Sequence, residues 1–131
     1  MPIVIASSFA DAADILAYRR ARSHGYSEQE ALRFGDNGIG LWGDPTYDTH
    51  RLSCALPFED WFQKWGTGRA RGKQVEVTYK GISIIGELRD TMPHRKNIHN
   101  GAGIDLNPAF SHAFGLSPPF LLPGFQWEWV Q

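Results

Sequence analysis

The chain has 131 residues, the length of one domain, and its 42% hydrophobic and 21% charged residues are typical of a globular protein rather than a disordered or fibrous one. Thirteen lysines and arginines against 14 aspartates and glutamates give a formal charge of −1, which disfavours a sequence-independent grip on nucleic acid. We expect no membrane span and no secretory signal, and the single cysteine excludes an internal disulfide.

The first part of the chain predicts two helices. Apolar residues at helical spacing, with aspartates at the start and arginines near the end, predict a helix over residues 10–22. Ser27 and Glu30 have the spacing of a capping box, which opens a second, shorter helix. We therefore interpret residues 1–38 as a helical extension that precedes the main domain.

The rest of the chain, residues 39–131, is typical of a small β domain, because short apolar segments are separated by Gly, Pro and Asp. Alternating residues 74–79, a Lys-Gly turn and residues 82–88 predict a β-hairpin. A final strand is expected over residues 125–129, with its aromatic side chains on one face. Extension and β domain should form one structural unit.

Two short helices are expected between these strands. An aromatic stripe at helical spacing predicts the first over residues 57–65, packed on the β domain. Asn107, followed by proline, predicts the N-cap of the second over residues 108–114. Cys54 lies between small and apolar neighbours, which favours a buried hydrophobic role over that of a nucleophile.

Three motifs follow one another in a characteristic order: residues 53–57 (SCALP), residues 90–93 (DTMP) and residues 104–107 (IDLN). They resemble, respectively, the Leu-Pro element, the Asp-x-x-Pro-like turn and the Ile/Phe-Asp-Leu-Ser-like segment of the rare lipoprotein A and expansin families. The resemblance covers residues 39–130 and implies a mainly β fold, a six-stranded double-psi β-barrel. Ser53 stands where rare lipoprotein A relatives often have histidine.

The resemblance also implies a catalytic residue. Cleavage of a glycosidic bond needs an acid, and hydrolysis commonly needs a second carboxylate, whereas a lytic transglycosylase can use one carboxyl group as acid and then base. In the related barrels the aspartate of the third motif does this work, which carries the role onto Asp105. The residues alone leave two interpretations: apolar neighbours could raise the pKa of Asp105 for acid catalysis, or Asp105 could cap the following helix.

Three further aspartates are candidates. Asp44 and Asp48 fall on the loop after the first expected barrel strand, where glycoside hydrolases of this fold can place their second carboxylate. Either could serve, although an exposed loop aspartate is more often a solvated residue than a catalytic one. Asp90 matches the turn aspartate that lies near the groove in these families, or it could hold its own loop as an Asx-turn.

Four other residues are candidates for substrate binding. Trp42 and Tyr47 flank the candidate loop and could stack on sugar rings. His50 could hydrogen-bond a carboxylate or a sugar hydroxyl, or could be an ordinary surface histidine. Arg95 could meet the carboxylates of peptidoglycan, or could belong to a solvated basic loop. We expect no cofactor and no metal, because the histidines fit no closed zinc pattern.

The resulting hypothesis is a peptidoglycan-active lytic transglycosylase or glycoside hydrolase, with Asp105 as acid/base and Asp44 or Asp48 assisting. The alternative is a non-catalytic glycan-binding or wall-loosening module, including a component of a phage tail or secretion machine. The expected partner is peptidoglycan or a related polysaccharide, and the expected place of action is the cell wall or periplasm after export or delivery by a particle.

Overall fold

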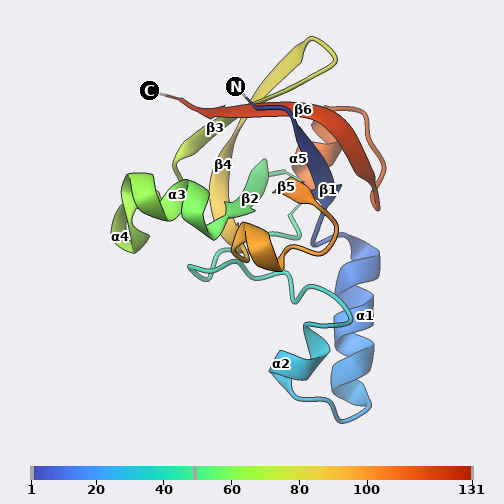
Figure 1. The fold of residues 1–131 in the computed structure, drawn as a ribbon. Helices are drawn as coiled ribbons and strands as arrows, with labels where there is room; N and C mark the ends of the chain where they lie inside the picture. The colour runs from blue at the N-terminus through green and yellow to red at the C-terminus, as the bar shows by residue number, and fades with distance from the viewer. Residues whose placement is uncertain (1, 49, 131) are drawn as a thin grey trace.

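The computed structural model describes residues 2–48 and 50–130, and its centre is a six-stranded mixed β-sheet that closes in the order β1-β5-β2-β4-β3-β6 (Figure 1). Neighbours β1 and β5 are parallel, as are β2 and β4, and the other pairs are antiparallel. The strands are β1 (Val4–Ser8), β2 (Ser53–Pro57), β3 (Gln74–Tyr79), β4 (Ile82–Met92), β5 (Ala102–Leu106) and β6 (Leu121–Trp129). The prediction of a mainly β fold with six strands is confirmed.

Strand β1 corrects the predicted division of the chain at residue 38. It pairs with β5 on one side and with β6 on the other, so the barrel closes only with it. The run Val-Ile-Ala-Ser-Ser is short and ends in two serines, so it lacks the alternation that marks the hairpin strands. The first barrel strand expected just before the loop of Asp44 and Asp48 is absent, since residues 39–48 form a loop with one isolated bridge between Ile39 and Pro45.

Helices α1 (Ala12–Ser23) and α2 (Glu28–Ala31) follow β1 and form a two-helix lobe below the barrel in Figure 1. The predicted capping box is confirmed: the Ser27 hydroxyl accepts from the Glu30 amide, and the Glu30 carboxylate accepts from the Ser27 amide. Helix α1 begins after Asp11, whose side chain accepts the Asp14 amide at 3.0 Å. Local capping chemistry therefore sets both helix starts.

The predicted hairpin is β3 and β4, and β4 runs on to Met92. Lys80 and Gly81 both have positive φ, 48° and 80°, as a two-residue type I′ turn requires. The remaining helices are α3 (Phe58–Trp65), α4 (Thr67–Ala70), α5 (Pro108–Ala113) and a short 3-10 turn (Arg95–Asn97). The predicted positions of α3, α5 and the last strand are confirmed.

The core lies inside the barrel and under α3 and α5. It contains fully buried side chains from every strand, together with Trp61 and Phe110. Cys54 is one of them, and burial raises the pKa of its thiol, so the predicted hydrophobic role is confirmed. No helix in the described part of the chain is long and apolar enough to span a membrane.

Candidate functional site

A row of four residues crosses four neighbouring strands. Ser7 on β1 is the register partner of Asp105 on β5. Ala55 on β2 is the register partner of Asp105 and also of Asp90 on β4. Register partners project on the same side of a sheet, so Ser7, Asp105 and Asp90 share one face. The Ala55 side chain lies between the two aspartates in this row and is buried in a cluster with Phe9, Ala10 and Met92. Two strand spacings place the Asp90 and Asp105 Cα atoms about 10 Å apart.

This row lies on the outer face of the barrel. The residues that flank Asp105 along β5, Ile104 and Leu106, are fully buried in the core, and Asp105 itself is partly exposed. Alternation along a strand therefore turns the Asp105 carboxyl away from the core. Sequence reasoning identified both aspartates but not their adjacency, which depends on the register of β2.

Asp105 has the environment of a general acid. Burial raises its pKa to about 7, and the hydrogen bond that the Ser7 hydroxyl donates to Oδ1 opposes this rise. The negative charge of Asp90 raises the pKa further, and Asp36 and Asp14 add to it. A carboxyl group with a pKa near 7 can carry its proton at neutral pH and release it in a reaction. Helix capping is not its role, because Asn107 caps α5.

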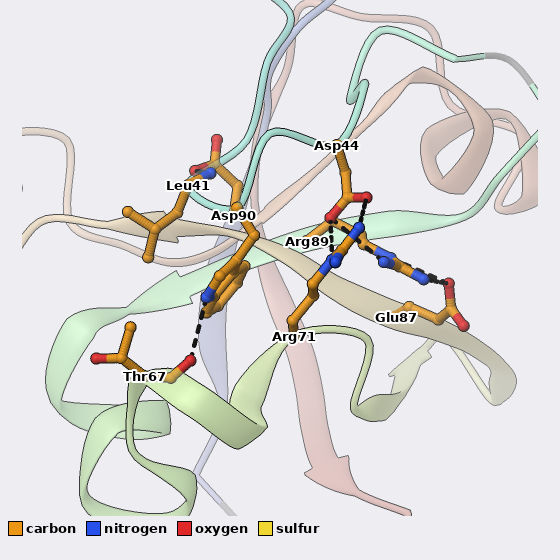
Figure 2. A network of polar contacts seen from close by, with 8 residues as sticks. Leu41, Asp44, Thr67, Arg71, Glu87, Arg89 and Asp90 are labelled. Atoms are coloured by element: carbon orange, nitrogen blue, oxygen red, sulfur yellow. Dashed lines mark hydrogen bonds and ion pairs between the residues drawn. The ribbon is translucent and has the colours of Figure 1, made fainter.

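Asp90 shares this environment. Burial raises its pKa to about 7, although Oδ1 accepts hydrogen bonds from the Thr91 amide at 2.8 Å and the Leu41 amide at 3.0 Å. Asp90 lies within β4, so the prediction of a turn residue is wrong. Its carboxylate instead ties the loop at Leu41 to the barrel (Figure 2).

Two more aspartates extend the acidic group toward the two-helix lobe. Burial raises the pKa of Asp14 on α1 to about 6 and also raises that of Asp36 in the following loop. Sequence reasoning used the aspartates of this helix only as helix-start residues and singled out neither Asp14 nor Asp36 as a site residue, so it missed both. No group of three or more acidic, histidine or cysteine side chains among the described residues is arranged to hold a metal ion.

Asp105 opens into a pocket of about 310 Å³ beside the 3-10 turn. Its walls are Met92, Pro93, Asn97, Ile98, His99 and Asn100. A second depression of about 330 Å³ lies next to it, and the two share Ile98. Each volume is at the lower end of the range for ligand pockets.

Asp44 belongs to a different network (Figure 2). Arg71 donates to both of its carboxylate oxygens at 2.8 and 3.0 Å, and Arg89 donates to Oδ2 at 3.3 Å. Arg89 also pairs with Glu87 at 2.9 Å. The hydrogen bonds from Arg71 hold the pKa of Asp44 below its usual value, and Asp44 is not among the charges that act on Asp105. The structure thus favours a structural role for Asp44, which holds its loop to Arg71 and Arg89, over the predicted catalytic role.

Asp48 is also engaged in its own loop. Its Oδ1 accepts the amides of His50 and Arg51, which lower its pKa. The His50 side chain is exposed. Neither Asp48 nor His50 lines the pocket at Asp105. Asx-turn geometry therefore accounts for the position of Asp48.

Of the predicted binding residues, Arg95 lines the depression next to the Asp105 pocket, whereas Trp42, Tyr47 and His50 line neither of the two. Trp42 donates its indole N–H to the Thr67 carbonyl at 3.2 Å and packs edge-on against Trp61, so it is not an open platform. Arg95 pairs with Asp60, and its amide donates to Glu59. Tyr47 is 54% exposed and lines a separate cavity beside α1. Of the predicted binding residues, Asp90 is the one in register with the Asp105 row.

The stability of an Asp44 variant tests this structural role. Asp44→Asn should lower the free energy of unfolding by about 1 to 2 kcal/mol, because Arg89 is left without its full partner while solvent screens the half-exposed Arg71. Denaturant unfolding measures this, with Asp48→Asn as the loop control. An Asp44→Asn variant that is as stable as the wild type would contradict the structural role of Asp44.

The buried carboxyls make stability depend on pH. Their folded-state pKa values, about 6 for Asp14 and about 7 for Asp90 and Asp105, lie above the unfolded value, so the folded state binds more protons between roughly pH 4 and 7. Their stabilisation is complete below pH 4 and is lost as the pH rises through 6 to 7. Thermal unfolding should show a melting temperature several degrees lower at pH 8 than at pH 5, and less so in Asp90→Asn. An unchanged or rising melting temperature would refute this.

Comparison with known proteins finds a structure of similar fold but no matching family. No family model matches the sequence, and no curated protein matches it. The structure is similar to that of the Streptomyces papain inhibitor, with a TM-score of 0.58 and 22% sequence identity, over 99% of this chain and 94% of that chain. At this identity the likeness shows a shared fold, which extends over nearly the whole of both chains.

Proposed function

We propose that this chain is a double-psi β-barrel enzyme that cleaves the glycan strands of peptidoglycan, as a lytic transglycosylase or a glycoside hydrolase, with Asp105 as general acid/base and Asp90 as the second carboxylate. The observation that carries the proposal is the row in which Asp105 and Asp90 flank Ala55 on one outer face. Both carboxyls have a pKa of about 7 there.

The barrel assignment rests on two features. Six strands close with two parallel and four antiparallel pairings, and the motifs at residues 90–93 and 104–107 bring their aspartates to the same level of the sheet. The resemblance to rare lipoprotein A and expansins implies such a meeting of motifs at a groove. Asp90 replaces Asp44 and Asp48 in the proposal because its charge acts on Asp105.

In the proposed reaction Asp105 first donates a proton and then accepts one. Protonated Asp105 donates to the glycosidic oxygen as the bond between that oxygen and the anomeric carbon breaks. The resulting carboxylate then accepts a proton from the attacking group, which is a hydroxyl of the same sugar in transglycosylation and water in hydrolysis. Asp90 favours the protonated form of Asp105 before the reaction, because the negative charge of Asp90 raises the pKa of the Asp105 carboxyl. Ser7 orients the Asp105 carboxyl through its hydrogen bond.

Purified sacculi test the proposal. The protein should release soluble muropeptides, and mass spectrometry of their ends distinguishes anhydro-sugars from reducing sugars, and so transglycosylation from hydrolysis. Binding to sacculi without release would contradict the enzyme and support the non-catalytic glycan-binding or wall-loosening module. The modest volume of the Asp105 pocket is the observation that favours this alternative. Inhibition of papain is measured alongside, because the protein in the structural comparison is named a papain inhibitor.

A further inference from the structure

A separate cavity lies between α1 and α5. Its volume is about 870 Å³, within the range of pockets that hold small molecules. Helix α1 supplies one wall, and the opposite walls come from Tyr47, Pro108, His112 and Pro118. The cavity shares no lining residue with the pocket at Asp105 or with the depression beside that pocket. The proposed glycan cleavage therefore gives this cavity no role.

The wall from α1 combines an apolar stripe with one arginine. Four lining residues recur at positions i, i+3, i+4 and i+7 and so lie along one side of the helix: Ala12, Ile15, Leu16 and Arg19. Leu16 is 48% exposed, so the protein itself covers only part of this apolar side chain. A ligand with small apolar side chains would remove this surface from water, which favours binding.

The start of α1 forms an acidic end of the cavity. Asp11 lines the cavity and is the N-cap of the helix, where its Oδ1 accepts the Asp14 amide at 3.0 Å. Asp11 is buried, yet no described residue donates a hydrogen bond to its other carboxylate oxygen. The Asp14 side chain accepts the amide of Ala10, a further lining residue, at 3.0 Å, which brings a second carboxyl to this end. A buried carboxylate with unused acceptor capacity favours a cationic donor.

Arg19 forms a basic end of the same cavity. Eight residues separate it from Asp11, which corresponds to about 12 Å along the helix axis. Arg19 makes no ion pair with any described residue, so its guanidinium can bind a carboxylate through two parallel hydrogen bonds. His112 on α5 adds a second side chain that can donate to an anion. The cavity thus offers one negative and one positive group with unused capacity, and the apolar stripe lies between them.

We propose that this cavity binds a free peptide of three residues, with the peptide amine on Asp11 and the peptide carboxylate on Arg19. Three extended residues span about 10 Å, close to the separation of the two charged residues along α1. Small or branched apolar side chains on the peptide match the alanine, isoleucine and leucine side chains of the α1 wall. A ligand with a single charge would leave either Asp11 or Arg19 without a partner. The site goes beyond the proposed glycan cleavage and does not depend on it.

Calorimetric titration with the tripeptide alanyl-leucyl-alanine, with both termini free, tests this site. The wild type should bind the tripeptide. Amidation of the peptide carboxylate and acetylation of the peptide amine should each weaken binding by about tenfold or more, because each removes one charge-assisted contact. These two blocked peptides test the two ends of the cavity separately.

Variants of the protein match the blocked peptides. Arg19→Gln should weaken binding of the free tripeptide and should bind the free and amidated peptides equally. Asp11→Asn should bind the free and acetylated peptides equally, and asparagine keeps the N-cap, so α1 stays capped. Arg20→Gln is the control for Arg19→Gln, because Arg20 is exposed and does not line the cavity. Asp105→Asn should bind the tripeptide as the wild type does.

Three outcomes overturn the peptide site, whether or not sacculi release muropeptides. The first is a wild type that does not bind the tripeptide. The second is equal binding of the free and acetylated peptides by the wild type, which would show an anion site without a contact for the amine. The third is a wild type that forms dimers instead, which Leu16→Glu dissociates, because a second copy of the chain would then cover this face.

Discussion

The Asp105→Asn variant is expected to release muropeptides from sacculi about 10²- to 10⁴-fold more slowly than the wild type. Asparagine keeps the size of the side chain and can still receive the hydrogen bond from Ser7, but it can neither donate the acidic proton nor take it back. The loss should appear in the rate of release at saturating substrate, because the change removes the proton donor of the chemical step and keeps the size of the side chain that lines the pocket.

The same variant should be more stable than the wild type at pH 8. A neutral amide removes the cost of ionising a carboxyl whose pKa burial has raised to about 7, so the melting temperature should rise at pH 8 and change little at pH 5. Asp48→Asn is the control, since this loop aspartate has a lowered pKa and lies outside the pocket. An Asp105→Asn protein that still releases muropeptides at the wild-type rate rules out the proposed acid.

Local chemistry explains why much of the fold could be predicted. The hairpin turn, the Ser27 capping box and the Asn107 cap each depend on residues within a few positions of one another. Strand β1 could not be predicted in this way, because its two neighbours come from the far end of the chain and its own sequence carries little alternation. The position of β1 in the sheet depends on its long-range pairing with β5 and β6.

The site was predictable as a set of residue types and not as an arrangement. Asp105 and Asp90 were both singled out by their motifs, but Ala55 brings them into one row through β2. Asp44 was unpredictable for the same reason, since Arg71 and Arg89 reach it from other elements and hold its charge. Charge partners across a barrel depend on register, which no local pattern contains.

Asn107→Ala is expected to destabilise the protein by about 3 to 5 kcal/mol, the largest effect of any single change considered. Asn107 is fully buried, and its Oδ1 accepts the amides of Ser53 at 3.1 Å and Phe110 at 3.0 Å. Its Nδ2 donates to the backbone carbonyls of the 46–51 segment, at Thr46, Asp48 and Arg51. One side chain thus joins strand β2, helix α5 and the loop that precedes β2.

Loss of this amide leaves several buried backbone groups without their present partners, which is costly in a protein interior. Denaturant unfolding of Asn107→Ala measures the effect, and Asn97→Ala, at an exposed position of the 3-10 turn, is the matched control. Asn107→Asp should be nearly as unstable at neutral pH, because a carboxylate keeps the two acceptor contacts but faces three carbonyl oxygens without a donor. A change below about 1 kcal/mol in the alanine variant would show that the loop finds other partners. Since this residue follows Asp105 by two positions, its hydrogen bonds also fix where β5 ends and α5 begins, and so hold the proposed acid at its level in the row.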